Sequence, residues 1–284
     1  MTPRKTYRRV GWTLLTAVIV CYLGALGWFK ANESKFIYSP TKGLVATSDS
    51  SSPMYQLVEI TSSDSIKLVC LILPALPMDS SATWILYLHG NAYNIFGARN
   101  LARYRMLQDL KVNILAVDYR GYGNSGGEPS ESGLYRDAEA GYKYLRTVKN
   151  VPYEKIVIYG WSLGSGVATE LATRVPAAGL VLEGAFKSIG AVGQENYPYL
   201  PVHLILGQRF DSIEKIGRVT MPKLFIHAVD DETVPIAHGR ALYDKAPAPK
   251  TFLEVTGGHA LDVAKDKSKF LSGISVFLKQ VFPQ

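Results

Sequence analysis

The hydrophobic and polar positions of this 284-residue chain separate one long apolar segment near the N-terminus from many short apolar runs that follow. Residues 10–29 contain no charged side chain. Roughly 20 residues at about 1.5 Å each would span about 30 Å as a helix, which matches the hydrocarbon thickness of a bilayer. The pattern therefore predicts a transmembrane signal-anchor over residues 10–29, after a basic flank over 1–9 and before a juxtamembrane linker over 30–53.

The same segment also fits a cleaved signal peptide. Ala25, Leu26 and Gly27 provide small residues where a signal peptidase cuts, behind a basic start and an apolar middle. The apolar run is long for a signal peptide, and this favours a retained anchor. Both interpretations stay open at this point.

Beyond a polar loop over residues 48–53, apolar runs of strand length alternate with amphipathic stretches of helix length. This alternation predicts a mostly parallel sheet with helices on both faces, in one domain over residues 54–284. Sites on such sheets form at the carboxyl ends of the strands. The eight expected strands cover residues 55–60, 66–73, 84–88, 113–117, 155–159, 179–182, 224–226 and 251–255, and the main helices cover 97–110, 134–148, 167–172, 236–245 and 268–281.

The charge of the chain changes the picture at its N-terminus. The net charge is +7, and Arg4, Lys5, Arg8 and Arg9 precede any acidic residue. Without these four the remaining chain carries only about +3, and no basic run with interleaved aromatic residues follows, so nucleic-acid binding is not indicated. Basic residues before the apolar segment predict a cytoplasmic N-terminus and an extracytoplasmic domain, which would be secreted if the segment were cleaved.

The most informative motif is Gly160-Trp161-Ser162-Leu163-Gly164, directly after the buried strand expected at 155–159. In the G-x-S-x-G pattern the serine occupies a sharp turn between a strand and a helix, which exposes its hydroxyl at the edge of the sheet. The flanking glycines are expected because a Cβ atom there would collide with a neighbouring strand or helix. Taken alone, the pattern is too frequent by chance to identify a nucleophile.

Two downstream strands end in residues that could activate Ser162. Asp231 follows the strand at 224–226, and His259 follows the strand at 251–255. A serine hydroxyl becomes nucleophilic when a neutral imidazole takes its proton, and a carboxylate fixes the tautomer of that imidazole. Ser162, Asp231 and His259 occur in the chain order of one class of serine hydrolases. They are therefore the predicted catalytic residues.

The strand at 84–88 ends in His89-Gly90-Asn91-Ala92, a loop placed to offer a backbone N–H to a developing oxyanion. The expected donors are the backbone N–H groups of Asn91 and Leu163. His89 is interpreted as a buried residue that holds this loop and not as a catalyst.

Other polar residues at strand ends are assigned no chemistry. Asp118 and Arg120 are expected to form a structural ion pair or to anchor loops. His203, His227 and His238 lack cysteine or clustered acidic partners at zinc-site spacing, so no metal or cofactor is expected. Cys21 and Cys70 lie too far apart in this organisation to pair.

Together these motifs resemble the α/β-hydrolase superfamily, and more narrowly the abhydrolase-domain proteins grouped with serine aminopeptidase-type hydrolases. The resemblance extends from about residue 36 to the end of the chain. It rests on FIYSP at 36–40, HGNA at 89–92, DYRGYGNSGGEPSE at 118–131, GWSLGSG at 160–166, HAVDDETVP at 227–235 and GGHA at 257–260.

The resemblance implies the α/β-hydrolase fold with a short cap at about residues 186–221, and several members carry one N-terminal anchor. It places the catalytic acid three residues before Val-Pro, at Asp231, with Asp230 as the second choice and Glu183 as a position that other hydrolases use. Two residues differ from the common glycines of the family. Ala228 is expected to be harmless, and Tyr93 is expected to bring a ring close to the oxyanion loop and narrow the pocket.

The predicted protein is thus a membrane-anchored serine hydrolase that cleaves carboxylic ester or thioester bonds through an acyl-serine intermediate. The position next to a bilayer suggests lipid, lysophospholipid or acyl-protein substrates. The alternative enzyme is a serine peptidase or amidase of the aminopeptidase type, because the same residues serve both reactions. A catalytically inert binding protein on a hydrolase fold is the alternative of a different class. The sequence does not indicate an oligomeric state.

Overall fold

The computed structural model describes residues 3–43, 55–77, 83–259 and 263–282. An eight-stranded sheet with the order β10-β9-β8-β7-β4-β6-β3-β2 forms its centre. β2 pairs with β3, and β3 with β6, in antiparallel fashion, whereas the other neighbours are parallel. The strands are β2 (Gln56–Thr61), β3 (Lys67–Leu73), β4 (Trp84–Leu88), β6 (Asn113–Val117), β7 (Ile156–Trp161), β8 (Gly179–Glu183), β9 (Lys223–Ala228) and β10 (Lys250–Val255).

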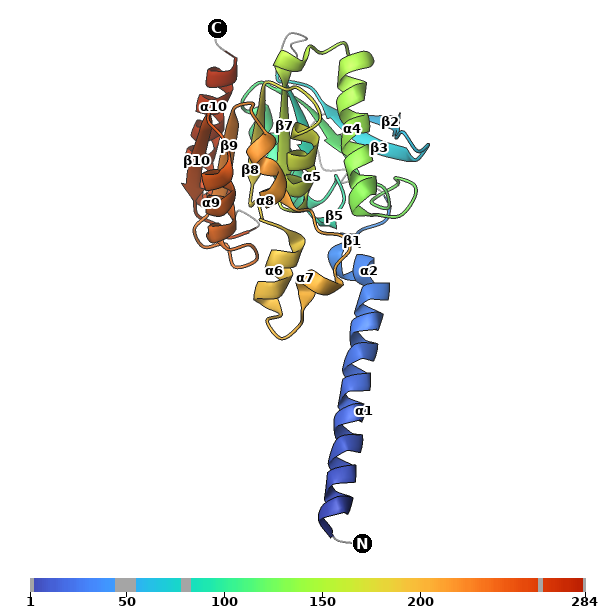
Figure 1. Ribbon diagram of the computed structural model, residues 1–284. Helices are drawn as coiled ribbons and strands as arrows, with labels where there is room; N and C mark the ends of the chain where they lie inside the picture. The colour runs from blue at the N-terminus through green and yellow to red at the C-terminus, as the bar shows by residue number, and fades with distance from the viewer. Residues whose placement is uncertain (1–2, 44–54, 78–82, 260–262, 283–284) are drawn as a thin grey trace.

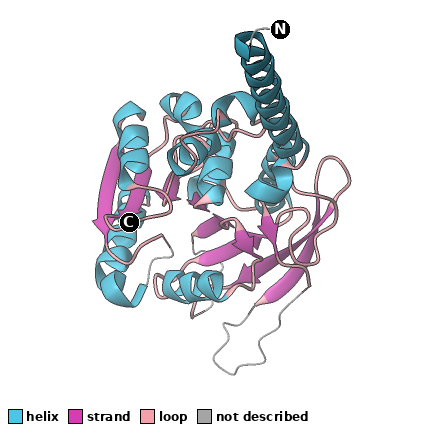
Figure 2. Ribbon diagram, turned by 90° about the horizontal axis from the view of Figure 1, so that it is seen from below, coloured by secondary structure: helices cyan, strands magenta, loops and turns pink. Residues whose placement is uncertain are grey.

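Helices cover both faces of this sheet (Figures 1 and 2). One face packs on α3 (Ala98–Gln108) and α10 (Val263–Val281), and the other packs on α4 (Glu131–Thr147), α5 (Leu163–Ala172), α8 (Ser212–Lys215) and α9 (Ile236–Lys245). Every residue of β6, β7 and β8 is buried, because helices exclude water from both sides of these strands. The predicted mostly parallel eight-stranded sheet is confirmed.

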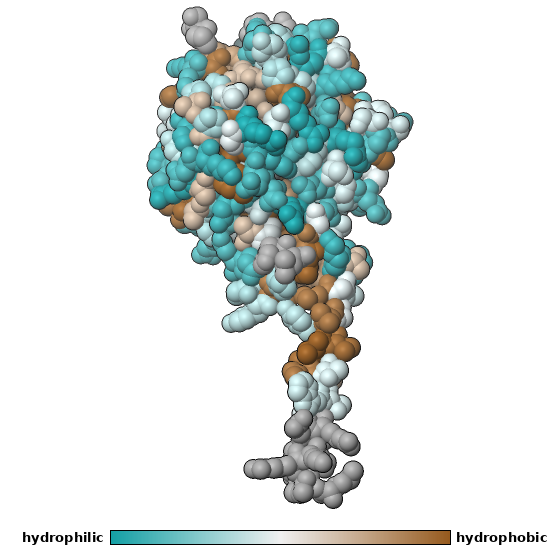
Figure 3. All heavy atoms as spheres, viewed as in Figure 1, coloured by the Kyte–Doolittle hydropathy of each residue, from teal (hydrophilic) through white to brown (hydrophobic). Residues whose placement is uncertain are grey.

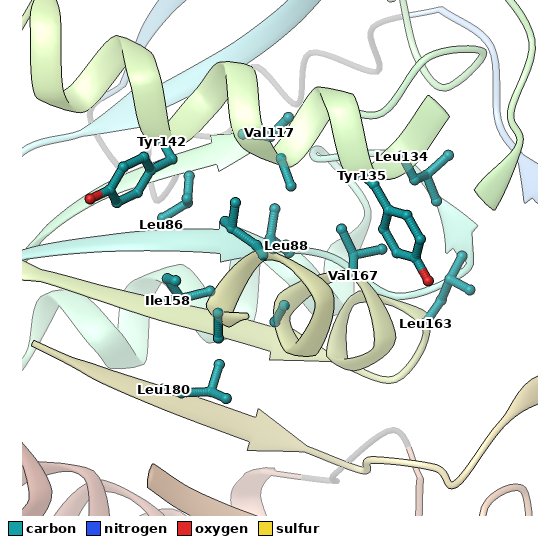
Figure 4. Packing of buried hydrophobic residues seen from close by; sticks show 14 of the residues in the cluster. Leu86, Leu88, Val117, Leu134, Tyr135, Tyr142, Ile158, Leu163, Val167 and Leu180 are labelled. Atoms are coloured by element: carbon teal, nitrogen blue, oxygen red, sulfur yellow. The ribbon is translucent and has the colours of Figure 1, made fainter. Parts of the chain in front are cut away.

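The core beneath α4 and α5 shows how the strand sequences produce this packing. Alternate residues of β4 and β7, including Leu86, Leu88 and Ile158, point to the same face and meet Leu134 and Val167 from the two helices (Figure 4). All five side chains are fully buried. This packed layer fixes the start of α5, which follows directly after the G-x-S-x-G serine.

The N-terminal segment forms the long helix α1 (Pro3–Ala31), which extends away from the domain (Figure 1). Its residues Gly11–Ala31 have a mean hydropathy of 1.8, and none of its most apolar stretch is buried in the protein. Apolar side chains therefore cover its surface (Figure 3). The helix is a candidate membrane span, and a signal sequence would have the same character.

Residues after α1 pack directly onto the domain. Only Asn32 separates α1 from the short helix α2 (Glu33–Ile37), and β1 (Ser39–Pro40) then pairs with β5 (Ala92–Tyr93). The predicted linker thus begins with two ordered elements, and its predicted boundary with the domain at residues 53 and 54 lies outside the described residues. The loop expected at 48–53 also lies outside them.

The segment after β8 contains α6 (Ile189–Asn196) and α7 (Val202–Ile205), within the range where a cap is expected. Both helices lie at the end of the domain from which α1 projects (Figure 1). The remaining elements are two short 3-10 helices, η1 (Tyr153–Lys155) and η2 (Ile216–Arg218).

Candidate active site

Ser162 occupies the sharp turn between β7 and α5. Its φ and ψ angles are 51° and −120°, an unusual conformation for a residue with a side chain. Its backbone N–H donates to the Glu183 carbonyl oxygen at 2.9 Å, and its own carbonyl oxygen accepts from the Ser165 N–H at 2.8 Å. The neighbouring chain therefore holds a backbone conformation that isolated residues seldom adopt.

The two glycines of the motif are required by close packing, as the sequence predicts. A Cβ atom at Gly160 would overlap the Gly164 carbonyl oxygen and lie 2.6 Å from the Ala168 Cβ atom, in α5. A Cβ atom at Gly164 would overlap the Leu88 carbonyl oxygen, at the end of β4. Side chains at these positions would thus push α5 away from the sheet and displace Ser162.

The structure brings Ser162, His259 and Asp231 into one hydrogen-bonded row. The Ser162 Oγ atom lies 2.7 Å from His259 Nε2, and His259 Nδ1 lies 2.7 Å from Asp231 Oδ2. A carboxylate can only accept, so the Nδ1 atom carries the proton and the Nε2 lone pair faces the serine hydroxyl. This is the tautomer that a general base for Ser162 requires.

The loop after β9 orients the Asp231 carboxylate. Its Oδ1 atom accepts from the backbone N–H groups of Thr233 at 2.9 Å and Val234 at 2.8 Å, which leaves Oδ2 for His259. His227, near the end of β9, is buried. Its Nε2 atom lies 2.8 Å from the Val234 carbonyl oxygen, in the same loop. Burial lowers the pKa of His227, which favours its neutral form.

Asp230, the second choice for the acid, has a different role in the geometry. Its carboxylate accepts from the backbone N–H groups of Gly257 and Gly258, each at 3.0 Å. These two bonds hold the pKa of the Asp230 carboxyl below its usual value, and the bond from the Gly258 N–H has the larger effect. Asp230 therefore fastens the loop that carries His259, and it does not contact the imidazole in the described hydrogen bonds.

Glu183, the other acidic position considered, is taken by a buried ion pair. Its Oε1 atom accepts from Arg103 Nη2 at 2.6 Å, and its Oε2 atom accepts from the Tyr159 hydroxyl at 2.5 Å. The Arg103 guanidinium also stacks on the Trp161 ring, 3.7 Å from its centroid. Arg103 belongs to none of the sequence motifs, although an arginine among the apolar positions of LARYRML (101–107) is a signal for a buried partner.

The other polar residues at the strand ends anchor loops. His89 is fully buried, and its Nε2 atom lies 3.2 Å from Asp118 Oδ1. Burial raises the pKa of Asp118, and the contact with His89 opposes this shift. Arg120 instead pairs with Asp137 and Asp64, each at 2.7 Å. Asp118 and Arg120 thus have separate partners and do not pair with each other.

A cavity of about 390 Å³ opens beside Ser162. This volume lies in the usual range for small-molecule sites, roughly 300–1,000 Å³. The predicted oxyanion donors Asn91 and Leu163 both line it, and Leu163 is the first residue of α5, where backbone N–H groups have no partner within the helix. Further lining comes from Phe36, Ile37, Gly90, Ala92, Arg99, Trp161, Phe186, Ile189, Val192, Gly193, Thr233, Val234 and His259.

Tyr93 does not narrow this cavity, which corrects the expectation from the sequence. It is not among the lining residues, and its side chain is 49 % exposed. The backbone at Tyr93 adopts a φ of 71° within β5, and its Cβ atom lies beside Gly97, just before α3.

The described part of the chain contains no cluster of three or more His, Cys, Asp or Glu side chains that could hold a metal ion. Cys70 is buried and Cys21 is exposed, and both are free thiols.

Known proteins share extended similarity with this chain. The model of the alpha/beta hydrolase family matches residues 85–268. The chain belongs to the alpha/beta hydrolase family. It is 33% identical over 258 residues to an uncharacterised protein of Mycobacterium tuberculosis, covering 90% of this chain and 91% of that protein. This hydrolase is also 32% identical over 221 residues to human alpha/beta hydrolase domain-containing protein 17C, covering 76% of this chain and 64% of the human protein.

Solved structures share the fold of this hydrolase. The Pyrococcus furiosus esterase Pf2001 superposes with a TM-score of 0.69 at 20% identity, covering 85% of this chain and 98% of the esterase. Est1E of Butyrivibrio proteoclasticus, solved with ferulic acid bound, superposes with a TM-score of 0.68 at 17% identity, covering 80% of this chain and 100% of Est1E. At these identities the likeness describes the arrangement of the chain and not its substrate.

Proposed function

We propose that this member of the alpha/beta hydrolase family is a membrane-anchored serine hydrolase that cleaves carboxylic ester or thioester bonds. The observation that carries the proposal is the hydrogen-bonded row of Ser162, His259 and Asp231 on the wall of an apolar cavity. Ser162 is the proposed nucleophile, His259 the general base, and Asp231 the residue that orients His259.

The proposed reaction begins when Ser162 Oγ attacks the acyl carbon and its proton moves to His259 Nε2. The tetrahedral oxyanion is stabilised by the backbone N–H groups proposed at Asn91 and Leu163. As the bond to the leaving group breaks, His259 gives its proton to the departing alcohol or thiol. His259 then takes a proton from a water molecule as the water oxygen attacks the acyl carbon. The same proton passes from His259 Nε2 to Ser162 Oγ as the acyl bond breaks, which releases the carboxylic acid and restores Ser162.

The lining of the cavity favours acyl substrates over peptides with a free amino terminus. Phe36, Ile37, Phe186, Ile189 and Val192 offer apolar contacts for a hydrocarbon chain. None of the described residues that line the cavity is Asp or Glu, the residue types that bind an α-ammonium group, whereas Asp230 and Glu232 line a neighbouring hollow on the other side of His259. We therefore rank an aminopeptidase-type activity second.

The apolar helix supports a membrane location for the proposed enzyme. Retained as an anchor, α1 would hold the domain beside a bilayer, with the basic N-terminus in the cytoplasm and the domain on the other side. Cleaved as a signal peptide, the segment would release a secreted domain. The substrates proposed for the anchored form are lipids, lysophospholipids or acylated proteins.

Hydrolysis of two substrate series tests the proposal: p-nitrophenyl esters of rising acyl length and aminoacyl p-nitroanilides. We expect the wild-type chain to cleave the esters, and Ser162→Ala to lose about 10⁴-fold or more in kcat. Faster cleavage of the anilides would favour the peptidase. Equal rates for wild type and Ser162→Ala would contradict a serine nucleophile.

A further inference from the structure

The hollow on the other side of His259 differs in character from the cavity beside Ser162. Its volume is about 410 Å³, and it shares Arg99, Thr233 and His259 with the cavity. The two spaces therefore meet along these three residues, directly beside the imidazole. We call this second space the polar hollow, because the rest of its described lining is charged or glycine: Asp230, Glu232, Gly257, Gly258 and Lys265.

The proposed reaction places a leaving group at the boundary between the two spaces. The departing alcohol or thiol takes its proton from His259 Nε2, the atom that lies 2.7 Å from Ser162 Oγ. The leaving group must therefore lie within hydrogen-bond reach of His259 when its bond to the acyl carbon breaks. With the acyl chain in the apolar cavity, the polar hollow is the space beside His259 that is left for the leaving group.

The four charged side chains of the polar hollow differ in their partners. The Asp230 carboxylate accepts from two backbone N–H groups of the loop that carries His259, and Lys265 acts on the same carboxylate electrostatically. The charges of Asp230 and Lys265 therefore offset each other. Arg99 and Glu232 are exposed, and neither takes part in an ion pair with another described residue. These two charges are available to a ligand.

Arg99 lies closer to the reacting groups than Glu232 does. It is the second residue of α3 and lines both spaces, whereas Glu232 lines only the polar hollow. Among the described residues that line the cavity, Arg99 is the one with a permanent charge. A guanidinium binds a carboxylate or a phosphate through two parallel N–H···O bonds. An anionic group close to the scissile bond would therefore meet Arg99 first.

We propose that Arg99 and the polar hollow form the leaving-group subsite, and that this subsite selects an alcohol or thiol that carries a carboxylate or a phosphate. The inference deepens the proposed function and rests on it for the identity of the reaction. It adds a requirement on the charge of the leaving group that the acyl chain does not set. Glu232 has the opposite charge in the same hollow and weakens this preference, so Arg99 and Glu232 act in opposite directions.

Thioesters that differ in the charge of the leaving thiol test the subsite on the full chain in detergent micelles. The anionic substrates are S-butyryl-3-mercaptopropionate and S-butyryl-2-mercaptoethyl phosphate, the neutral one is the primary amide of the first, and butyrylthiocholine is the cationic one. We expect the wild type to favour the better anion over the amide by about tenfold in kcat/KM, as one charged hydrogen-bonded contact would provide. The larger of the two anionic ratios identifies the anion. Added salt should lower this preference, since it screens exposed charges.

Variants assign the preference to Arg99. Arg99→Gln should bring the ratio of anion to amide to within twofold of one, and Arg99→Lys should keep part of it, because lysine retains the charge without the paired N–H groups. Glu232→Gln should raise the ratio, which a merely structural role would not do. Arg218→Gln, at an exposed arginine of η2 before the start of β9, is the matched control and should leave the ratio unchanged. Equal ratios in wild type and Arg99→Gln, or a preference for butyrylthiocholine over both anions, would overturn the subsite.

Binding separates the failure of the subsite from the failure of the proposed function. Isothermal titration calorimetry with Ser162→Ala measures the affinity for the uncleaved anionic thioester and for its amide. We expect the anion to bind about tenfold more tightly, and Ser162→Ala/Arg99→Gln to bind both alike. Equal affinities in Ser162→Ala would overturn the subsite. If the wild type cleaved none of the thioesters, the proposed function would fail, and the calorimetry would still decide whether Arg99 binds the anion.

Discussion

Two regions meet at the cavity, and they differ in how far their side chains are exposed to solvent. The first is the catalytic edge, formed by the ends of β7, β8, β9 and β10, where Glu183 and Arg103 are each 1 % exposed and every member of the Ser162 row has a partner. The second is the anchor–cap region, formed by α2 and the α6–α7 segment, where Tyr199 is 92 % exposed. Buried, paired groups hold a geometry to within tenths of an ångström, and exposed rings are free to meet a variable partner. In the proposed enzyme the first region determines the chemistry and the second selects the substrate.

We expect the largest loss in the free energy of unfolding when a buried, paired group of the catalytic edge is replaced. Arg103→Met removes the only described cation paired with the Glu183 carboxylate and leaves that charge buried beside Tyr159. We expect the free energy of unfolding to fall by about 3–5 kcal/mol. We also expect lower kcat, because the Glu183 carbonyl oxygen holds the Ser162 N–H. Urea titration of the full chain in detergent micelles measures the first effect.

Two variants control for this change. Arg218→Met alters an exposed arginine of η2 and should change the free energy of unfolding by no more than about 0.5 kcal/mol. Arg103→Met/Glu183→Gln removes the buried charge together with its partner and keeps an acceptor for Tyr159. It should be more stable than Arg103→Met alone. If the double variant were no better than the single one, the ion pair would not explain the loss.

A smaller effect is expected in the anchor–cap region. Glu33→Ala leaves the backbone N–H groups of Gly207 and Gln208 without their carboxylate, at a site that water can reach more easily. The expected cost is about 1–2 kcal/mol, with faster hydrogen exchange at these two amides. Exchange measured by mass spectrometry should show the change there and not in β7. Glu59→Ala, at an exposed surface ion pair, is the control. Slow exchange at residues 207 and 208 in Glu33→Ala would contradict the role of the Glu33 carboxylate in holding these amides.

Much of the catalytic edge could be predicted because its signals are local. β4 and β6 match the expected strands residue for residue. The apolar run of β4 lies between Thr83 and His89 and that of β6 between Asn113 and Asp118, so the sequence leaves little choice of limits. A five-residue motif predicts Ser162, and the strand at 251–255 predicts His259. Three consecutive acidic residues follow the strand at 224–226, and the family pattern selects Asp231 among them. The chain order of these residues made them candidates, and the parallel sheet brought them to one edge.

The anchor–cap region could not be predicted in the same way because its contacts are distant in sequence. Residues 30–53 were expected to form a linker, and Asn32, Glu33, Ser34 and Lys35 have the polar character of one. The partner of Glu33 at Gly207 lies 174 residues away, so nothing near Glu33 indicates its burial. Phe36 likewise gives no sign in sequence of lining the cavity. For Tyr93, the family pattern gave the position but not the direction of its ring.

Covalent trapping of the nucleophile tests the central claim most directly. The full chain in detergent micelles is treated with a fluorophosphonate, in which a serine oxygen attacks phosphorus and fluoride leaves, and the modified peptide is identified by mass spectrometry. The account predicts one adduct on Ser162, its absence in Ser162→Ala, and labelling slowed by about 10³-fold or more in His259→Gln. An unlabelled wild-type protein that is folded, or an adduct on a different serine, would contradict the account.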